Sequence, residues 1–350
     1  MELLKSYFLI YAPLAMGVLC FLYYKIAKKY NISDMPVSRS SHKDVTVTGF
    51  GIFAIFALII YSVVYPNTLN SFFIIGFLMI SIISFIDDVV FVKHFIRLIF
   101  QVFALTLMTL ELPFNYISID KIPLIVAAII LGIGVLNAFN FMDGINGMLG
   151  LNTLVILISF WWLNNNSVDV NGKVINFTYN HFLYSIISGV FIFIVFNLRK
   201  KAKVFAGDVG SISIAFIIFY LMLNLIFKTG NYAYLLLFVV IGLDAGLTVI
   251  FKLLLKENIF VPHRDFLFKK LVHVGKYSHV RVSFVYAIIQ ALISIIVIAL
   301  PLQGKLPAQF SILFIFIVGL GAAYIVTRNK FTKKRVFKYN KEKYNDDDED

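Results

Sequence analysis

The chain of 350 residues has one cysteine, Cys20, and only 14% of its residues are charged. A single cysteine excludes a disulfide or a cysteine-based metal site within one chain. Soluble domains carry about a quarter charged residues, whereas here 60% of the residues are hydrophobic. The shortage of charge therefore indicates an integral membrane protein, and no stretch is long and polar enough to fold as a separate soluble unit.

Long apolar runs account for most of the chain. A membrane-spanning helix needs about 20 mostly apolar residues, and eleven stretches approach that length. We therefore predict an all-α, polytopic membrane domain over residues 1–326, followed by a charged, disordered cytoplasmic tail over 327–350. The predicted transmembrane helices are residues 7–24, 49–65, 70–86, 95–112, 122–140, 147–163, 181–198, 211–227, 232–252, 283–301 and 309–326.

Basic residues are distributed unevenly between the two sides of this predicted bundle. With the N-terminus outside, all but five of the 31 Lys and Arg residues fall in the inner segments; the five are Lys5, Lys121, Lys173, Lys228 and Lys305. The positive-inside rule then places the C-terminus and the inner loops in the cytoplasm. This asymmetry, with attraction to anionic lipid headgroups, explains the net charge of +12 without a nucleic-acid partner.

Acidic residues are scarce, yet several gather on the predicted cytoplasmic side. Asp87 and Asp88 follow the third predicted span, Asp143 follows the fifth, Asp208 precedes the eighth and Asp244 lies within the ninth. Carboxylates cost free energy near hydrocarbon, so such a group points to a function. Their oxygen atoms suit a divalent cation that binds phosphate, which favours an enzyme acting on a lipid. For Asp244 the alternative is a buried structural acid.

The loop after the fifth predicted span carries Asn137, Asn140, Asp143 and Asn146 but no Lys or Arg. Because amides both donate and accept hydrogen bonds, they suit the edge of a nucleobase. The glycines of this loop let the backbone approach a ligand closely. The alternative is an ordinary polar turn between two spans.

Cations suited to phosphate occur in three further places. Arg39 and His42 stand in the first inner loop, Arg97 in the fourth predicted span, and His263 and Arg264 in the last inner loop. Cationic side chains form strong hydrogen bonds with phosphate oxygens. For the first loop, an ordinary positive-inside loop is the alternative.

In order and type, these motifs resemble those of the polyprenyl-phosphate N-acetylhexosamine-1-phosphate transferases, a bacterial family that starts lipid-linked glycans. The likeness runs from about residue 34 to residue 286. Each motif is weak alone, but five in this order on one side of the membrane are specific. They are Asp34-x-Pro36…Arg39-Ser-Ser-His42, Asp87-Asp88, Asn137-x-x-Asn140-x-x-Asp143-Gly144, Gly207-Asp208-x-Gly210-Ser211 and Pro262-His263-Arg264.

The resemblance implies an Mg²⁺-dependent enzyme of the bacterial inner membrane, with Mn²⁺ a possible substitute, a cytoplasmic active site and a homodimer as a possible assembly. Polyprenyl (undecaprenyl) phosphate would react with a UDP-N-acetylamino sugar to give polyprenyl-diphospho-sugar and UMP. Asp87, Asp88 and Asp208 would be catalytic, with Asp208 and Asp88 as metal ligands. The substrate-binding residues would be Arg39, His42, Arg97, Asn137, Asn140, Asp143, Asn146, Asp244, His263 and Arg264.

Several positions depart from the family pattern. Thr48-Gly49-Phe50-Gly51 stands in place of Arg-Gly-Gly-Gly, Asn146 replaces a second acid, and Phe266 replaces the second His of His-Arg-x-His. The last inner loop also lacks the three-His run of the murein branch, which favours a lipopolysaccharide- or teichoic-acid-type branch. The rival class is a transporter, which predicts acids near mid-span and two corresponding halves. No such repeat is visible in the sequence.

Overall fold

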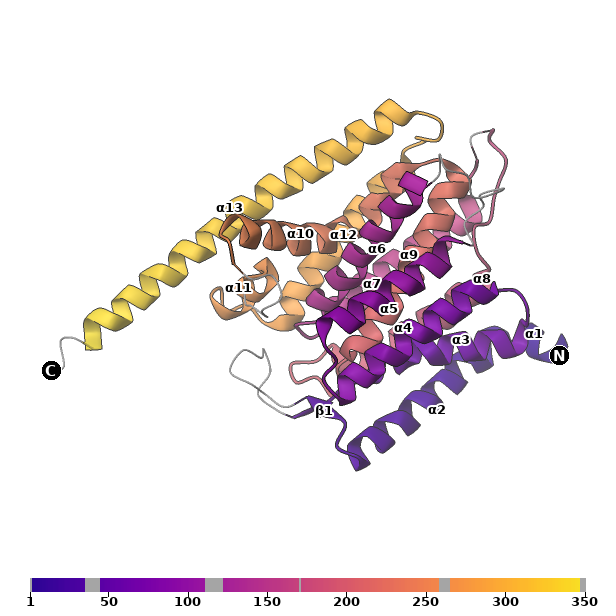
Figure 1. The fold of residues 1–350 in the computed structure, drawn as a ribbon, viewed down its shortest axis with the longest axis horizontal. Helices are drawn as coiled ribbons and strands as arrows, with labels where there is room; N and C mark the ends of the chain where they lie inside the picture. Colours follow the sequence, from indigo (N-terminus) through magenta and orange to yellow (C-terminus); the bar gives the residue numbers. More distant parts are fainter. Residues whose placement is uncertain (1, 35–44, 111–121, 170, 258–264, 347–350) are drawn as a thin grey trace.

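The computed structural model describes residues 2–34, 45–110, 122–169, 171–257 and 265–346. The chain is a helical bundle, as predicted, and in the described part the one sheet is a hairpin of two-residue strands (Figure 1). The elements are α1 (Glu2–Ser6), α2 (Phe8–Lys29), β1 (Ser33–Asp34), β2 (Thr46–Val47), η1 (Phe50–Ile52), α3 (Phe53–Val64), α4 (Ser71–Val89), α5 (His94–Thr109), α6 (Ile122–Met142), α7 (Met148–Asn166), α8 (Asn180–Asn197), α9 (Gly207–Thr229), η3 (Tyr232–Phe238), α10 (Val239–Leu254), α11 (Leu267–His273), α12 (His279–Ala299) and α13 (Leu306–Asp346).

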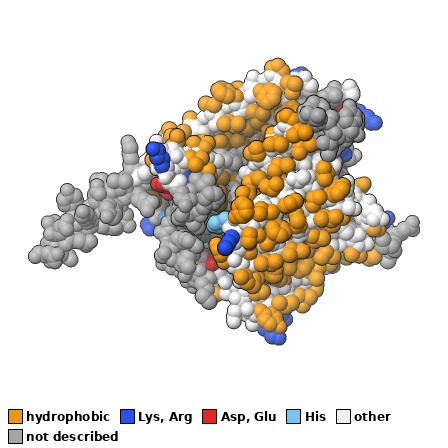
Figure 2. Space-filling model, in the orientation of Figure 1, with side chains coloured by type: hydrophobic (Ala, Val, Ile, Leu, Met, Phe, Trp, Pro, Cys, Tyr) orange, Lys and Arg blue, Asp and Glu red, His pale blue; other side chains and the backbone are white. Residues whose placement is uncertain are grey.

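Each of the eleven predicted apolar stretches coincides with helical structure. Within the described residues, nine helices are long and apolar enough to cross a membrane, whereas Phe50–Val64 and His94–Thr109 are shorter. On the face in Figure 2, hydrophobic side chains form a broad continuous area, with most charged side chains at its margins. The chain is therefore a polytopic membrane protein.

The centre of the bundle is α9, and α13 lies at its periphery. In the apolar window of α9, 89% of the residues are buried, against 11% for α13. α9 packs against α4 and α6. The C-terminal ends of α4 and α6 and the N-terminal end of α9 lie at the same end of the bundle. This arrangement brings together Asp87 and Asp88 of α4 and Asp208 of α9.

The last helix, α13, differs from its predicted end. It continues to Asp346, through the segment for which the charge run predicted a disordered tail, and projects beyond the bundle in Figure 1. Lys, Arg and Glu are good helix formers, so a charged sequence can extend an apolar helix.

The start of α9 is fixed by the strand that precedes η1. Phe205 donates its backbone N–H to the carbonyl of Val47 at 2.7 Å, and Gly51 donates to the carbonyl of Ala206 at 2.9 Å. A Cβ atom at Gly51 would collide with the backbone of Gly210. Glycine at this crossing therefore lets two backbones touch, which places the turn before Asp208.

Candidate active site

The carboxylate of Asp88 caps the N-terminus of α9 from a neighbouring helix. It accepts hydrogen bonds from the backbone N–H of Asp208 at 2.8 Å and of Val209 at 3.0 Å. The first N–H groups of a helix have no partner within the helix and carry partial positive charge, so a carboxylate is favoured there. Gly207 has φ +71°, and a Cβ atom on it would overlap the Asp88 carboxylate. Asp88 thus ties α4 to the turn that carries Asp208.

Asp87 points in a different direction, toward Arg97 of α5. Its Oδ1 accepts the backbone N–H of Val92 at 2.7 Å, and its Oδ2 lies 2.6 Å from Nη1 of Arg97. The same Nη1 lies 2.7 Å from Oδ2 of Asp208. One guanidinium nitrogen therefore bridges two carboxylates, and the adjacent acids Asp87 and Asp88 have different partners.

Asp143, in the turn after α6, approaches the same helix start. Its carboxylate accepts the backbone N–H of Gly207. Burial, together with the nearby carboxylates of Asp88 and Asp208, raises the pKa of Asp143 well above its ordinary value, although the Gly207 hydrogen bond opposes the shift. Asn140, three residues earlier on α6, hydrogen-bonds to the carboxylate of Asp208. The first turn of α9 is thus surrounded by four carboxylates, one amide and one guanidinium.

The other two predicted amides serve the protein itself. Asn137 donates to Oε1 of Gln101 at 3.1 Å and to the carbonyl of Ile133 at 2.8 Å. Asn146 is buried and donates to the carbonyl of Arg199 at 2.8 Å. Both side chains therefore hold neighbouring segments in place, and neither is directed at the acid group.

Asp244 lies apart from the acid group, in a network of its own. It is 2% exposed and accepts hydrogen bonds from the N–H of Leu267 at 2.9 Å, the N–H of Phe268 at 3.2 Å and the hydroxyl of Tyr286 at 2.7 Å. These contacts fit the structural alternative that the sequence left open, since the acid accepts the first N–H groups of α11.

The cations of the first and last inner loops, Arg39, His42, His263 and Arg264, lie outside the described residues. The sequence did not single out Lys269 of α11. A Cβ atom on Gly144 would come 2.8 Å from Cε of Lys269, so this lysine lies beside the turn of Asp143. Its Nζ is 5.4 Å from the ring centre of Phe266. Nothing in the spacing of the last loop indicated this contact, because it depends on where α11 lies relative to the turn after α6.

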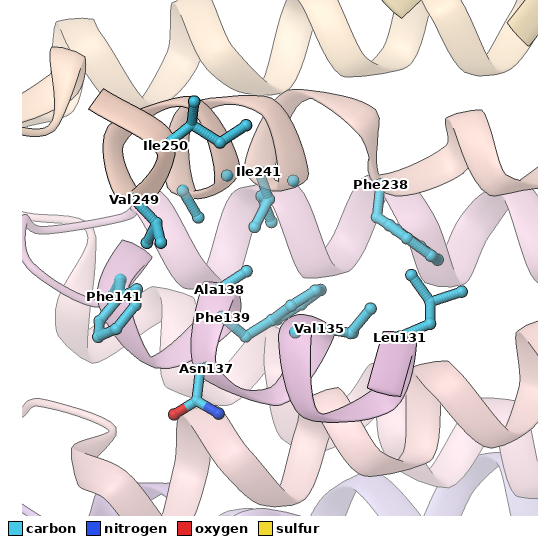
Figure 3. Close-up of a pocket in the computed structure, with 14 residues that line it drawn as sticks. Leu131, Val135, Asn137, Ala138, Phe139, Phe141, Phe238, Ile241, Val249 and Ile250 are labelled. Carbon is cyan, nitrogen blue, oxygen red and sulfur yellow. The ribbon is translucent and has the colours of Figure 1, made fainter. Parts of the chain in front are cut away.

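An apolar groove of about 440 Å³ lies between α6 and the segment η3–α10 (Figure 3). Gly134 and Gly242 face open space in it, and Val135, Ile241 and Ile250 line it. The Asn137 side chain points away from these apolar groups in Figure 3. Since Asn137 and Asn140 are one turn apart on α6, the groove runs close to the acid group.

The donor set suits a hard divalent cation such as Mg²⁺, which prefers carboxylate and amide oxygens. Within the described part of the chain, the four carboxylates have one ion-paired guanidinium, which contacts two of them, so this part of the site is short of positive charge. Among the described residues, however, no three acidic, His or Cys side chains are already arranged around one point. Three of the carboxylates, those of Asp87, Asp88 and Asp143, accept backbone N–H groups, and two, those of Asp87 and Asp208, are held by Arg97.

Comparisons with known proteins agree with the motifs. The family model of glycosyl transferase family 4 matches residues 70–226, which include the whole acid group. A Bacillus subtilis protein described as a probable undecaprenyl-phosphate N-acetylglucosaminyl 1-phosphate transferase is 23% identical over 289 residues, 75% of this chain and 76% of the relative.

Two shorter matches are phospho-N-acetylmuramoyl-pentapeptide-transferases. That of Carboxydothermus hydrogenoformans is 30% identical over 29% of this chain and 28% of the relative, and that of Leuconostoc citreum is 34% identical over 23% of each. These matches do not favour a transporter. With the acids gathered at the start of α9, the matches support the polyprenyl-phosphate N-acetylhexosamine-1-phosphate transferase family that the motifs resemble.

Proposed function

We propose that the protein transfers an N-acetylamino-sugar 1-phosphate from a UDP-sugar to polyprenyl phosphate. An oxygen of the lipid phosphate attacks the β-phosphorus, and the bond from that phosphorus to the bridging oxygen breaks. UMP leaves with the bridging oxygen, and the product is polyprenyl-diphospho-sugar. The observation that carries this proposal is the group of four carboxylates around one helix start, with Arg97 among them.

Phosphoryl transfer depends mainly on positioning and on neutralising charge. A bound Mg²⁺ would be held by Asp208 and a neighbouring carboxylate and would offset the charge of the diphosphate. Asp88 fixes the backbone of Asp208, since it accepts the N–H of that residue at 2.8 Å. Arg97, which pairs with Asp87, lies at the membrane boundary, and its guanidinium can pair with a lipid phosphate.

The nucleotide side is proposed to lie at the turn after α6. Asn140 and Asp143 meet the start of α9 there, and their amide and carboxyl groups can bind the polar edge of uracil. We also propose that the phosphates are bound by cations of the first and last inner loops, namely Arg39, His42, His263 and Arg264. We assign Asn137, Asn146 and Asp244 to support of the fold.

The groove between α6 and α10 is proposed to receive the polyprenyl chain. Its lining is almost entirely apolar, and glycines at Gly134, Gly242 and Gly246 leave it open. An isoprenoid chain gains free energy from such a surface by dispersion contacts. Since α6 also carries Asn140, a lipid lying along it would present its phosphate near Arg97 and Asp208.

The active site is proposed to face the cytoplasm of a bacterial inner membrane. The distribution of Lys and Arg supports this orientation. Single cysteines placed in residues 164–180 and 253–282, in a Cys20→Ser background, should react with an impermeant thiol reagent from opposite sides of the membrane. Labelling of both from outside would refute the orientation.

The activity is tested with purified protein, undecaprenyl phosphate, Mg²⁺ and a panel of UDP-sugars, with UMP release as the readout. UDP-N-acetylglucosamine is the first candidate, because it matches the name of the Bacillus subtilis relative. The last inner loop, which lacks the three-His run of the murein branch, favours a surface glycan other than murein. Asp208→Asn is the matched control, since it keeps the shape and removes the charge. It should lower turnover at least ~10²-fold, the effect of removing one electrostatic stabiliser. No UMP release with any UDP-sugar would refute the proposal.

We also propose that the protein can form a homodimer, which light scattering on the same purified sample tests.

A further inference from the structure

Arg97 occupies the space between two carboxylates that a cation would need. Its Nη1 is 2.6 Å from Oδ2 of Asp87 and 2.7 Å from Oδ2 of Asp208. The Arg97 side chain is 17% exposed, that of Asp87 8% and that of Asp208 25%, so the contacts are partly shielded from bulk water. A Mg²⁺ ion takes its oxygen ligands at about 2.0–2.1 Å. It cannot be bound by both of these oxygens while the guanidinium nitrogen lies between them.

The neighbouring carboxylate, Asp88, is a poorer ligand than this pair, because it already holds the start of α9. Both oxygens of Asp88 already accept backbone N–H groups of α9, at 2.8 and 3.0 Å. Each Asp88 oxygen keeps a second lone pair, but moving this carboxylate toward a cation would weaken its bonds to the N–H groups at the helix start. The pair Asp87 and Asp208 requires only that one long side chain, Arg97, turns away.

We propose that Arg97 and a divalent cation compete for Asp87 and Asp208. In the metal-free protein Arg97 neutralises the two acids and holds α4, α5 and α9 together at this end of the bundle. When a cation binds the acids, the guanidinium is released and becomes available to a phosphate. This inference rests on the proposed function for its metal, and it assigns Asp87, in place of Asp88, as the carboxylate that shares the cation with Asp208.

The test measures metal affinity without substrate. Purified protein is stripped with EDTA and titrated with Mn²⁺, and free Mn²⁺ is followed by its electron paramagnetic resonance signal. Arg97→Gln removes the competitor and should bind Mn²⁺ about tenfold tighter than wild type or more, since a hydrogen bond between charged groups corresponds to at least about one decade in affinity. Without metal, Arg97→Gln should also unfold at a lower temperature, and Mn²⁺ should raise its Tm more than that of wild type.

Lys93→Gln is the matched control, because it removes the same charge at the residue that precedes α5. Lys93 is exposed and makes no ion pair with a described residue, so salt screens it, and its Mn²⁺ affinity should stay within about twofold of wild type. If Arg97→Gln does not survive purification, Arg97→Lys takes its place and should also bind Mn²⁺ tighter than wild type.

Two results would overturn the proposal, and they differ in meaning. If an Arg97 variant binds Mn²⁺ as tightly as wild type or more weakly, Arg97 does not compete with the cation. The proposed transferase function would not be affected by that result. No Mn²⁺ binding to any variant would remove both the competition and the metal site of the proposed function.

Discussion

The contact between Gly207 and Asp88 gives the most direct quantitative test of the site. Gly207 has φ +71°, a left-handed conformation that costs a residue with a Cβ atom roughly 1–2 kcal/mol. The added Cβ atom would also overlap the Asp88 carboxylate. Moving that carboxylate off even one of its two N–H partners adds about 1.5–3 kcal/mol, the net value of a hydrogen bond to a charged group.

The matched control is Gly304, which has φ +70° and open space where a Cβ atom would lie. Gly304→Ala should show the backbone cost alone, whereas Gly207→Ala should show the backbone cost and the collision. The free energy of unfolding is measured in mixed detergent micelles. Transferase turnover should fall sharply in Gly207→Ala, because Asp208 follows directly, and should remain in Gly304→Ala.

A double-mutant cycle with Asp88→Ala identifies the cause. If the added methyl group collides with the carboxylate, the double variant should lose less stability than the sum of the two single variants, by about the cost of the collision. Equal losses for Gly207→Ala and Gly304→Ala, together with strict additivity in the cycle, would refute the proposed role of Asp88 at the start of α9.

Three further variants test single side chains. Asp143→Asn should raise the Tm of the metal-free protein in alkaline buffer and have less effect in acid, measured between about pH 5 and pH 9; the pKa of Asp143 is raised on folding, so the folded state loses stability as the pH rises through that pKa. A constant difference across the range would contradict this. Asn146→Asp should lose about 1–3 kcal/mol without any gain in turnover, because its carboxylate would face the carbonyl of Arg199; unchanged stability would show that the amide is not needed there. Asp244→Asn should lower the Tm, because Leu267 and Phe268 lose part of their acceptor, and leave Mn²⁺ affinity unchanged; weaker Mn²⁺ binding would instead connect Asp244 to the site.

Much of the fold could be predicted from the sequence, because apolar length alone identifies membrane helices. The predicted stretch 70–86 became α4 and the stretch 211–227 became the larger part of α9. The gathering of Asp88 and Asp208 also followed, since helices that alternate in direction return their ends to the same side. Helix ends were less accurate: α9 begins at Gly207, because the Asp88 carboxylate caps its first turn.

The partners of each polar side chain could not be predicted. Asp88 and Asp208 are 120 residues apart, and no local pattern shows that one carboxylate is bound by the backbone of the other. Asn146 stands where the family pattern implied an acid, yet its amide donates to the carbonyl of Arg199. Asp244 and Asp87 look alike in sequence as acids at membrane helices. In the structure, Asp244 accepts a backbone N–H of α11, whereas Asp87 forms an ion pair with Arg97.

The short helix α5 has a consequence for the membrane around the site. Its 16 residues rise about 24 Å at 1.5 Å per residue, whereas the hydrocarbon layer is about 30 Å thick. A helix shorter than this layer draws the headgroups toward its ends. We therefore expect the bilayer to be locally thinner beside α5, so that lipid phosphates lie closer to Arg97. Turnover in vesicles of increasing acyl-chain length should fall as the bilayer thickens, and an unchanged rate would show that α5 does not deform its surroundings.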